Sequence, residues 1–559
     1  MQLGAVMHPL AIVVIGVAIV ITGILVFRLH AFLALILAAL TCALLTPQEA
    51  IERFLVQQSS IEVIDAGDGL RLALGPKDGA LVGERFQVVR AGEDGSIQTV
   101  AQLEIEKYIA GPNSNLQSQV VFTPEKTVEF DKQTWVIRGR DLAQAKKASK
   151  KTIGERVATT FGGYCGKIGI LIALAAIIGK CLLDSGAADR IVRSALNVVG
   201  ERGAPVAFVC SGFLLGIPVF FDTVFYLMIP LGKSLRIRTG RNYLLYILTI
   251  VAGGTMAHSL VPPTPGPLAV AEELNIDLGT MIIAGCLVGL CSSTAALFYA
   301  LLINRYFEVP LRESPDFSLA DIEKMANRPT SELPSLLVSL LPILLPVVMI
   351  AGFTFLVNFQ FVSKSSAMYP FLATIGNKNI ALGVGAVIAM ITLVVVKRST
   401  FKELATSVQA ALASGGVIIL ITAAGGAFGA TMKEAGIASL ISELGDYSTP
   451  IILTLAFLVT TAIRTAQGSA TVAMLTAVGI LAAFADPARL GCHPVYLALA
   501  IGCGSKPIAW MADSGFWVIC KMSGMTEGEG LRFISPLSIL MGVVGLLVTL
   551  LGATLFPLT

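Results

Sequence analysis

The sequence predicts an all-α polytopic membrane protein, built from two inverted repeats with re-entrant hairpins and broken helices, plus an inserted small β domain. Three observations support this fold class. Of the 559 residues, 55% are hydrophobic and only 14% are charged, a composition too apolar for an ordinary soluble protein. Several apolar runs approach the ~20 residues that a helix needs to cross a bilayer. One segment of charged, β-rich composition separates the first two runs from the others.

Ten apolar runs are expected to cross the membrane. The first has no basic residue before Arg28, so it lacks the positive start of a cleavable signal peptide and should remain as a helix. Glycine, proline and polar residues interrupt two further apolar stretches, 204–232 and 450–484, and we interpret these as re-entrant hairpins. The ten runs lie at about 8–27, 30–45, 165–184, 243–260, 279–303, 333–357, 379–396, 413–432, 493–511 and 534–556.

Lysine and arginine in the connecting segments predict the orientation. With the N-terminus outside and neither hairpin crossing, seventeen of these residues lie in the cytoplasm and only four lie in the opposite short loops. Hairpins that spanned the membrane would break this segregation, which favours re-entrance.

Residues 51–156 predict a soluble β-rich domain. Fifteen basic and fifteen acidic residues balance there, and β-rich runs at 85–90 and 99–108 flank Asp94-Gly95, a hairpin signal. The orientation places this insert outside the cytoplasm. A cluster of four lysines favours the opposite side: Lys146, Lys147, Lys150 and Lys151.

After the insert, the order of features repeats at an offset of 250 residues, with Gly254 opposite Gly504. Five crossings in each half would turn the second half upside down relative to the first, as in many secondary transporters. The expected organisation is two helices at 1–50, the insert at 51–156, the rest of the first repeat at 157–304, a cytoplasmic linker at 305–332 and the second repeat at 333–559.

The stretch 253–267 holds four prolines and three glycines, which cannot continue a helix. Non-helical backbone at membrane depth survives only inside protein or beside a polar cavity, so this break predicts a ligand site; the alternative is a plain loop outside the membrane. Interrupted stretches in both halves should converge at the midplane. The candidate substrate-binding residues are Gly254, Thr255, His258, Ser259, Pro263, Thr264, Gly266, Arg464, Gln467, Gly468, Ser469, Thr471, Gly504, Ser505 and Lys506.

Four charged residues are expected at membrane depth, where charge is costly and usually functional. Arg464 or Lys506 could pair with a substrate carboxylate, and Asp222 or Asp513 could carry a coupled proton. The structural alternative pairs Asp513 with Lys506 and leaves Arg464 to backbone carbonyls. His258 could equally be a hydrogen-bonding partner or a proton carrier. No cofactor or metal site is predicted, since the nine cysteines form no CxxC pair.

Four stretches resemble the gluconate permease family of gluconate:proton symporters: 221–230, His258-Ser-Leu-Val-Pro-Pro-Thr-Pro-Gly-Pro267, Arg464-Thr-Ala-Gln-Gly-Ser-Ala-Thr-Val-Ala473 and Asp513-Ser-Gly-Phe-Trp517. The resemblance covers roughly 1–50 and 157–559. It implies a bacterial inner-membrane protein, an elevator-like movement and a possible homodimer. Thr264, Asp222 and Ala512 depart from the residues that the family usually has, which puts gluconate itself in question.

We therefore expect a secondary transporter, not an enzyme, which imports gluconate or a related small sugar acid or hydroxy acid with a proton. Its partners would be this small anion, the proton and membrane lipid, without nucleic acid. Sodium coupling through carbonyls of the broken helices is one alternative. A transporter-like sensor that uses the β insert is another. An intramembrane aspartyl protease on Asp222 and Asp513 would leave the duplicated breaks unexplained.

Overall fold

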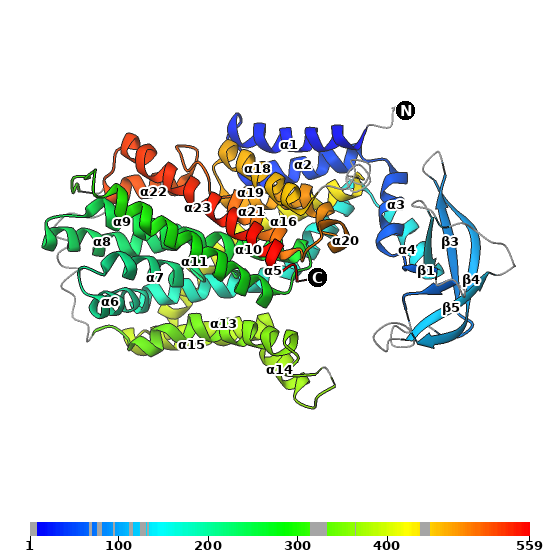
Figure 1. Cartoon of the computed structure of the whole chain (residues 1–559), viewed down its shortest axis with the longest axis horizontal. Coiled ribbons are helices and arrows are strands. Elements are labelled where there is room, and N and C mark those ends of the chain that lie inside the picture. The colour runs from blue at the N-terminus through cyan, green and yellow to red at the C-terminus, as the bar shows by residue number, and fades with distance from the viewer. Residues whose placement is uncertain are drawn as a thin grey trace. The chain divides into compact units, whose positions relative to one another are not determined.

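The computed structural model describes residues 8–65, 70–74, 81–92, 96–110, 116–122, 130, 134–313, 332–363, 365–436 and 448–558. Helices predominate, and one small sheet lies near the start of the chain (Figure 1). The chain divides into two compact units: 1–16, 38–160 and 430–443 form the first, and 17–37, 161–429 and 444–559 form the second.

The first unit contains a six-stranded antiparallel sheet with strand order β1-β2-β5-β4-β3-β6. β3 and β4 pair as the predicted hairpin, although Asp94 and Gly95 at its turn lie outside the described residues. The strands are β1 (Val63–Asp65), β2 (Leu70–Leu72), β3 (Arg85–Ala91), β4 (Ile97–Ala110), β5 (Leu116–Phe122) and β6 (Thr134–Arg138).

Both faces of this sheet bury apolar side chains. One face gathers Phe86, Val88 and Leu103, which are fully buried. Two helices, α3 (Gln48–Gln58) and α4 (Gly139–Ser149), supply Val56 and Leu142 to a second cluster on the other face. The alternation of side chains along a strand explains why consecutive residues of β3 serve different clusters.

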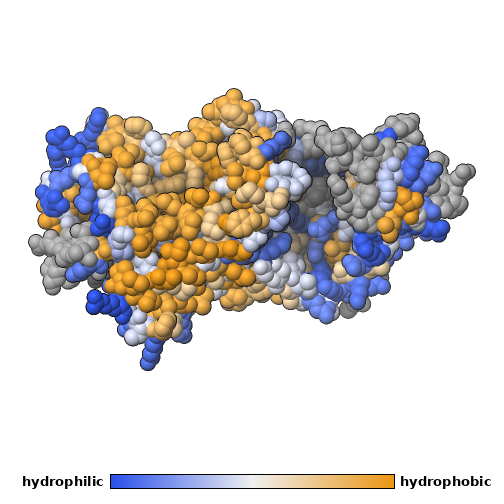
Figure 2. Space-filling view, turned by 90° about the horizontal axis from the view of Figure 1, so that it is seen from below, coloured by the Kyte–Doolittle hydropathy of each residue, from blue (hydrophilic) through white to orange (hydrophobic). Residues whose placement is uncertain are grey.

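The second unit is helical, and the long helices carry the apolar composition. Their exposed side chains include Phe298, Val348 and Val395, each more than 60% exposed. Apolar residues (orange) cover much of the face of this unit seen in Figure 2. Large exposed apolar surface of this extent is what lipid-facing helices require.

The helices before and after the sheet are named in chain order. The first part of the chain has α1 (Pro9–Leu25), α2 (Ala31–Leu45), α5 (Ile153–Ser185), α6 (Ala187–Val199), α7 (Ala204–Gly216), α8 (Phe221–Thr239), α9 (Tyr243–Leu260), α10 (Pro265–Glu273) and α11 (Leu278–Ile303). The remaining part has α13 (Leu336–Asn358), α14 (Tyr369–Ile375), α15 (Lys378–Lys397), α16 (Phe401–Glu434), α18 (Thr449–Gln467), α19 (Ala470–Leu481), η4 (Ala482–Phe484), α20 (Pro487–Leu490), α21 (Val495–Gly504), α22 (Ser514–Ser523) and α23 (Glu527–Leu555).

Among the described residues, eight helices are long and apolar enough to cross a membrane, or nine if the bent pair α2 and α3 is one span. Seven of the ten runs that the sequence predicts as crossings are among these eight helices. α1 and α2 have only 17 and 15 residues, and α3 bends away from α2 by 101°. The expected run 493–511 ends as a helix at Gly504, because a non-helical segment reaches from Ser505 to Asp513.

Each half contains a pair of helices joined by a short connection and a broken helix. In the first half these are α7 with α8, and α9 with α10; in the second they are α18 with α19, and α21 with α22. Counterparts begin about 250 residues apart, as the sequence repeat predicts. α18, with 19 residues, is one of the eight candidate spans, although the sequence predicts a re-entrant hairpin over 450–484.

The first break is narrower than the sequence predicts. α9 runs through Gly253, Gly254 and Ser259 and ends at Leu260, so only 261–264 are non-helical. Gly253 serves packing rather than the break, since a Cβ on it would lie 2.3 Å from the carbonyl oxygen of Val209 in α7. Small residues allow such close approach of helix backbones in membranes.

Candidate functional site

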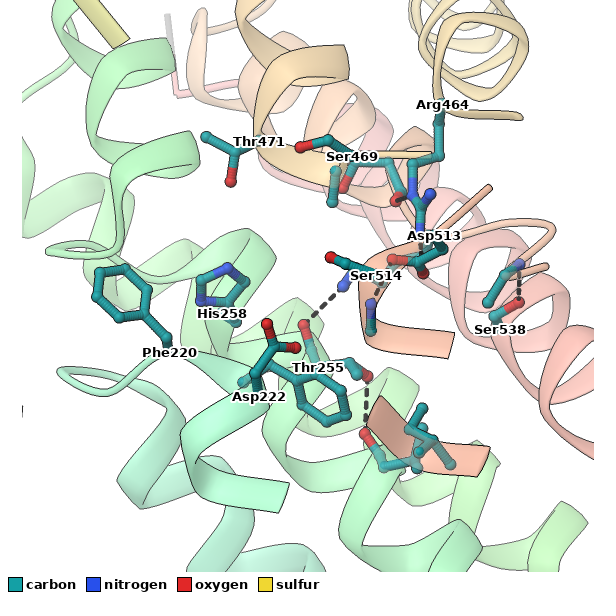
Figure 3. Close-up of a pocket in the computed structure, with 18 of the residues that line it drawn as sticks. Phe220, Asp222, Thr255, His258, Arg464, Ser469, Thr471, Asp513, Ser514 and Ser538 are labelled. Atoms are coloured by element: carbon teal, nitrogen blue, oxygen red, sulfur yellow. Dashed lines mark hydrogen bonds and ion pairs between the residues drawn. The ribbon is translucent and has the colours of Figure 1, made fainter. Parts of the chain in front are cut away.

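A cavity of about 400 Å³ lies within the helical unit, between elements of the two halves. In Figure 3, Phe220, Asp222 and His258 of the first half (green) face Ser469 and Thr471 of the second half (orange) across this space. A volume of this size falls in the range of small-molecule sites. Residues from all four interrupted stretches therefore line one cavity, although the break at 261–264 itself does not.

Three helix N-termini line the cavity. α8 contributes its first residues, including Asp222; α19 contributes Ser469 at its N-cap and Thr471; and α22 contributes Ser514 and Gly515. The first turn of a helix has backbone N–H groups without intrahelical partners, and its dipole end is positive. Such ends favour an anion.

Arg464 is committed to the protein. Its side chain is buried, and it donates to the carbonyl oxygens of Ser505 (3.1 Å) and Gly468 and to the carboxylate of Asp513. The other oxygen of Asp513 accepts from the backbone N–H of Gly515 (2.9 Å). Arg464 thus joins the α18–α19 connection to the segment that precedes α22 through hydrogen bonds. The structural alternative holds for Arg464, but Asp513 pairs with Arg464 and not with Lys506.

Lys506 lies in the second break and reaches across to the first half. It is 8% exposed, and its Nζ donates to the carbonyl oxygen of Thr255 in α9 (2.8 Å). No carboxylate pairs with it among the described residues. An ammonium group has three N–H donors, so a buried Lys506 with one such contact retains capacity to bind an anion.

Asp222 faces the cavity at the start of α8, and its residue is exposed there. No hydrogen bond or ion pair joins it to another described residue. A Cβ built on Gly515 would lie 3.3 Å from Oδ1 of Asp513 and 3.6 Å from Oδ1 of Asp222, so the two carboxylates flank this glycine. Arg464 therefore pairs with Asp513 and not with Asp222.

Hydroxyl and imidazole groups complete the polar lining. Thr255 donates to the carbonyl oxygen of Val251 (2.7 Å), which still leaves its hydroxyl oxygen able to accept. Nδ1 of His258 is buried and has no hydrogen-bond partner in the described part of the chain. Its ring packs edge-on against Phe220, with centroids 6.1 Å apart.

Nine of the predicted residues line the cavity, and the other eight lie elsewhere. The nine are Asp222, Thr255, His258, Arg464, Ser469, Thr471, Ser505, Lys506 and Asp513. Those outside its lining are Gly254, Ser259, Pro263, Thr264, Gly266, Gln467, Gly468 and Gly504.

Several of these outliers have packing roles. A Cβ on Gly266 would collide with Met474, and one on Gly504 would lie 2.5 Å from the carbonyl oxygen of Phe457. Gly468 has a φ of +78° and ends α18. The helix-breaking residues of the sequence therefore lie partly at the cavity and partly at close helix contacts outside its lining.

The other outliers lie in or near buried backbone. Thr264 donates to the carbonyl oxygen of Val261 (2.6 Å) and is 3% exposed, and Pro263 lines a small apolar cavity. Gln467 is 5% exposed, and neither side-chain amide atom has a partner among the described residues; the same holds for the hydroxyl of Ser259.

Apolar and small residues of the lining were not predicted from the sequence. Their signal was weak because they lie on apolar helices remote in sequence from the breaks; Ile418, Ile534, Ser538 and Met541 belong to α16 and α23. Ser514 and Gly515 stood inside a recognised stretch and could have been chosen as the first turn after Asp513.

Comparison with known proteins identifies the family. The sequence model of the GntP family permease matches residues 141–555. The chain belongs to this family. The resemblance predicted from the four stretches is thereby confirmed, and this GntP permease is an integral membrane transport protein and not an enzyme.

Its relatives include a gluconate permease of Pseudomonas aeruginosa, 32% identical over 394 residues that cover 70% of this chain and 85% of the relative. The low-affinity gluconate transporter of Escherichia coli K12 is 30% identical over 398 residues, covering 70% and 86%. The L-idonate transporter of the Gnt-II system of the same strain is 28% identical over 387 residues, covering 69% and 85%.

The GntP permease also shares its fold with a solved transporter. The structure of the Alcanivorax borkumensis YdaH transporter aligns with a TM-score of 0.53, covering 81% of this chain and 94% of that one at 13% identity. At this identity, the likeness concerns the arrangement of helices alone.

Proposed function

We propose that this permease imports gluconate or a related small sugar acid together with a proton. The observation that carries the proposal is the convergence of three helix N-termini and Lys506 on one cavity of about 400 Å³. This arrangement attracts an anion without the help of a bound sodium ion. The relatives named as gluconate and L-idonate transporters fit an anionic polyhydroxylated substrate.

In this proposal Lys506 binds the substrate carboxylate. Arg464 holds Asp513 and two carbonyls, so it orients the site and does not contact the substrate. Hydroxyl groups of Ser469, Thr471 and Ser514 lie where they can bond the hydroxyls of a sugar acid. Polar groups of this kind fix orientation and give specificity in an otherwise apolar site.

Asp222 is the proposed proton carrier. With Asp222 ionised, the charges of Arg464, Lys506, Asp222 and Asp513 cancel; with Asp222 protonated, one positive charge remains for the anion. Proton uptake and substrate binding then strengthen each other, because linkage between two sites is reciprocal. Co-transport of a proton also cancels the cost of moving an anion into a negative interior, about 2.3 kcal/mol per 100 mV.

Sodium coupling is the less favourable alternative. Carbonyl oxygens at the breaks are the groups that a transported cation would use. Here Lys506 occupies the carbonyl of Thr255, and Arg464 occupies those of Ser505 and Gly468. These fixed cations supply the positive charge that a sodium ion would otherwise bring.

We also propose which side of the membrane each domain faces. We place the N-terminus and the insert, 51–156, outside the cytoplasm of a bacterium, with the two repeats inverted and the linker 305–332 inside, although 314–331 lie outside the described residues. The segregation of lysine and arginine supports this placement. A cysteine introduced at the exposed Lys147, in an otherwise cysteine-free variant, should react with an impermeant maleimide in intact cells.

Uptake into proteoliposomes tests the central proposal. Labelled gluconate should accumulate under an inward proton gradient and stop when a protonophore is added, while an inward sodium gradient should have no effect. L-idonate and other sugar acids, added unlabelled, should compete. Uptake driven by sodium alone, or none for any sugar acid in protein that remains monodisperse, would contradict the proposal.

A further inference from the structure

A second cavity, also of about 400 Å³, lies between α6 and α8 and shares no lining residue with the substrate cavity. The two helices contact each other in the helical unit (Figure 1). The cavity is lined by three leucines and by a set of polar side chains: Arg193, Asn197, Glu201, Ser234 and Arg238. Such a lining combines apolar and charged side chains.

The cavity lies beside the end of a membrane span. α8 ends at Thr239, and Tyr243 begins a candidate span of 31 residues. Val198 and Ile237, close in sequence to the lining, are 84% and 48% exposed. Exposed apolar side chains among arginines are typical of the level at which lipid head groups meet the protein.

Positive charge exceeds negative charge around this cavity. The segments 187–203 and 234–242 contain six arginines and only two acidic residues. One further acid, Glu308, pairs with Arg236 (2.7 Å). Basic pockets between membrane helices bind the head groups of anionic lipids. The charged residues are Asp189, Arg190, Arg193, Glu201, Arg202, Arg236, Arg238 and Arg241.

The two arginines of the lining are held in place by acidic neighbours. Nε of Arg193 donates to Asp189 (2.8 Å), and Nη2 of Arg238 donates to Glu201 (2.8 Å). The second pair is 68% and 52% exposed, so it contributes little and can open. A guanidinium carries five N–H donors in a planar fork, which suits the two oxygens of a phosphate.

A purely structural role does not explain the cavity. Arg236 and Arg238 complement the negative end of the α8 dipole, as arginines in a last helical turn often do. That role requires no space of this size, and it does not require apolar side chains beside the charges. The combination of space, leucines and arginines matches a molecule with a phosphate and an acyl chain.

We propose that the cavity between α6 and α8 binds an anionic phospholipid. Arg238 and Arg193 bind its phosphate, Asn197 and Ser234 add hydrogen bonds, and the acyl chains lie along the leucines and Val198. Lipid binding at this cavity does not depend on which substrate the permease transports.

Native mass spectrometry of the full-length protein in detergent tests this site. The protein is titrated with phosphatidylglycerol, with phosphatidylcholine and glycerol phosphate in parallel. Wild type should retain one phosphatidylglycerol in preference to phosphatidylcholine. Arg238→Gln should weaken retention about tenfold, as expected when one charge-assisted contact is lost. Arg241→Gln, exposed and outside the lining, is the matched control and should bind as wild type.

A second variant guards against indirect effects. Ser234→Trp keeps every arginine but fills the cavity, and it should also lose phosphatidylglycerol. Equal retention by Arg238→Gln and wild type, or unchanged retention by Ser234→Trp, would overturn the proposal. Equal binding of phosphatidylcholine would mean that the cavity is an apolar groove without preference for anionic lipid. Displacement of the lipid by glycerol phosphate at similar concentration would mean that the cavity binds free phosphate. Both outcomes contradict an anionic lipid site.

Discussion

The two broken helices of the permease differ in what surrounds their breaks. In the first half, residues 261–264 separate α9 from α10, and none of them lines the cavity between the two halves. In the second half, Ser505, Lys506, Ala509 and Asp513 of the longer break all line it. The same kind of interruption therefore lies outside the cavity in one half and lines it in the other.

The charges are divided between the halves in the same unequal way. Arg464, Lys506 and Asp513 come from the second half, whereas Asp222 is the acidic residue that the first half contributes to the lining. In the proposed mechanism, the second half of the duplicated architecture binds the anion and the first half binds the proton. A break in a membrane helix marks polar backbone, while the side chains around it decide whether it can serve a ligand.

The largest expected effect is the loss of Lys506. Lys506→Met should reduce sugar-acid uptake by about 100-fold or more, because the site loses its one cation not paired with a carboxylate among the described residues. Initial rates in proteoliposomes measure it. Lys521→Met, which removes an exposed lysine in α22, is the control and should retain uptake. Normal uptake by Lys506→Met would remove the anion-binding role from the second half.

Asp222→Asn tests the proton-binding half. The variant should lose proton-driven accumulation but keep exchange of labelled for unlabelled substrate, because the neutral amide imitates a permanently protonated carboxyl group. Counterflow and gradient-driven uptake are measured on the same vesicles. Asp184→Asn breaks a local pair with Lys180 outside the cavity and should accumulate substrate normally. Accumulation by Asp222→Asn at the wild-type level would exclude this residue.

Arg464→Lys should act mainly on stability. A lysine cannot reproduce the planar fork that serves Asp513, Ser505 and Gly468 together, and a buried network that loses contacts costs about 3 kcal/mol or more. A clear drop in the thermal unfolding midpoint in detergent is expected. Substrate affinity of the surviving folded protein should change much less than in Lys506→Met; the reverse order would mean that Arg464 contacts the substrate.

The smallest effect is expected at Thr264. Thr264→Val removes the hydrogen bond to Val261 and should cost about 1 kcal/mol of stability. Because Thr264 does not line the cavity, the order of preference among gluconate, L-idonate and other sugar acids should stay the same. Competition assays give this order. A changed order would place the first break at the substrate and weaken the contrast between the halves.

Much of the site could be predicted because its chemistry is unusual for a membrane. Buried charge and helix-breaking residues are rare in apolar runs, so Asp222, Arg464, Lys506 and Asp513 were conspicuous in the sequence, and all four line the cavity. The signal failed for Gly254 and Gly266, since glycine serves close helix packing as well as chain breaks. It also failed for Ile418 and Met541, which are ordinary residues of apolar helices.

The sequence by itself determined the membrane class, the β insert, the family and the set of polar residues, because these depend on composition and local pattern. Tertiary structure decided the partners. Whether Asp513 pairs with Lys506 or Arg464 depends on where α18, α21 and α22 place atoms that are more than forty residues apart in sequence. Tertiary packing also left Lys506 without a carboxylate partner among the described residues, since electrostatic interactions follow distance in space and not order along the chain.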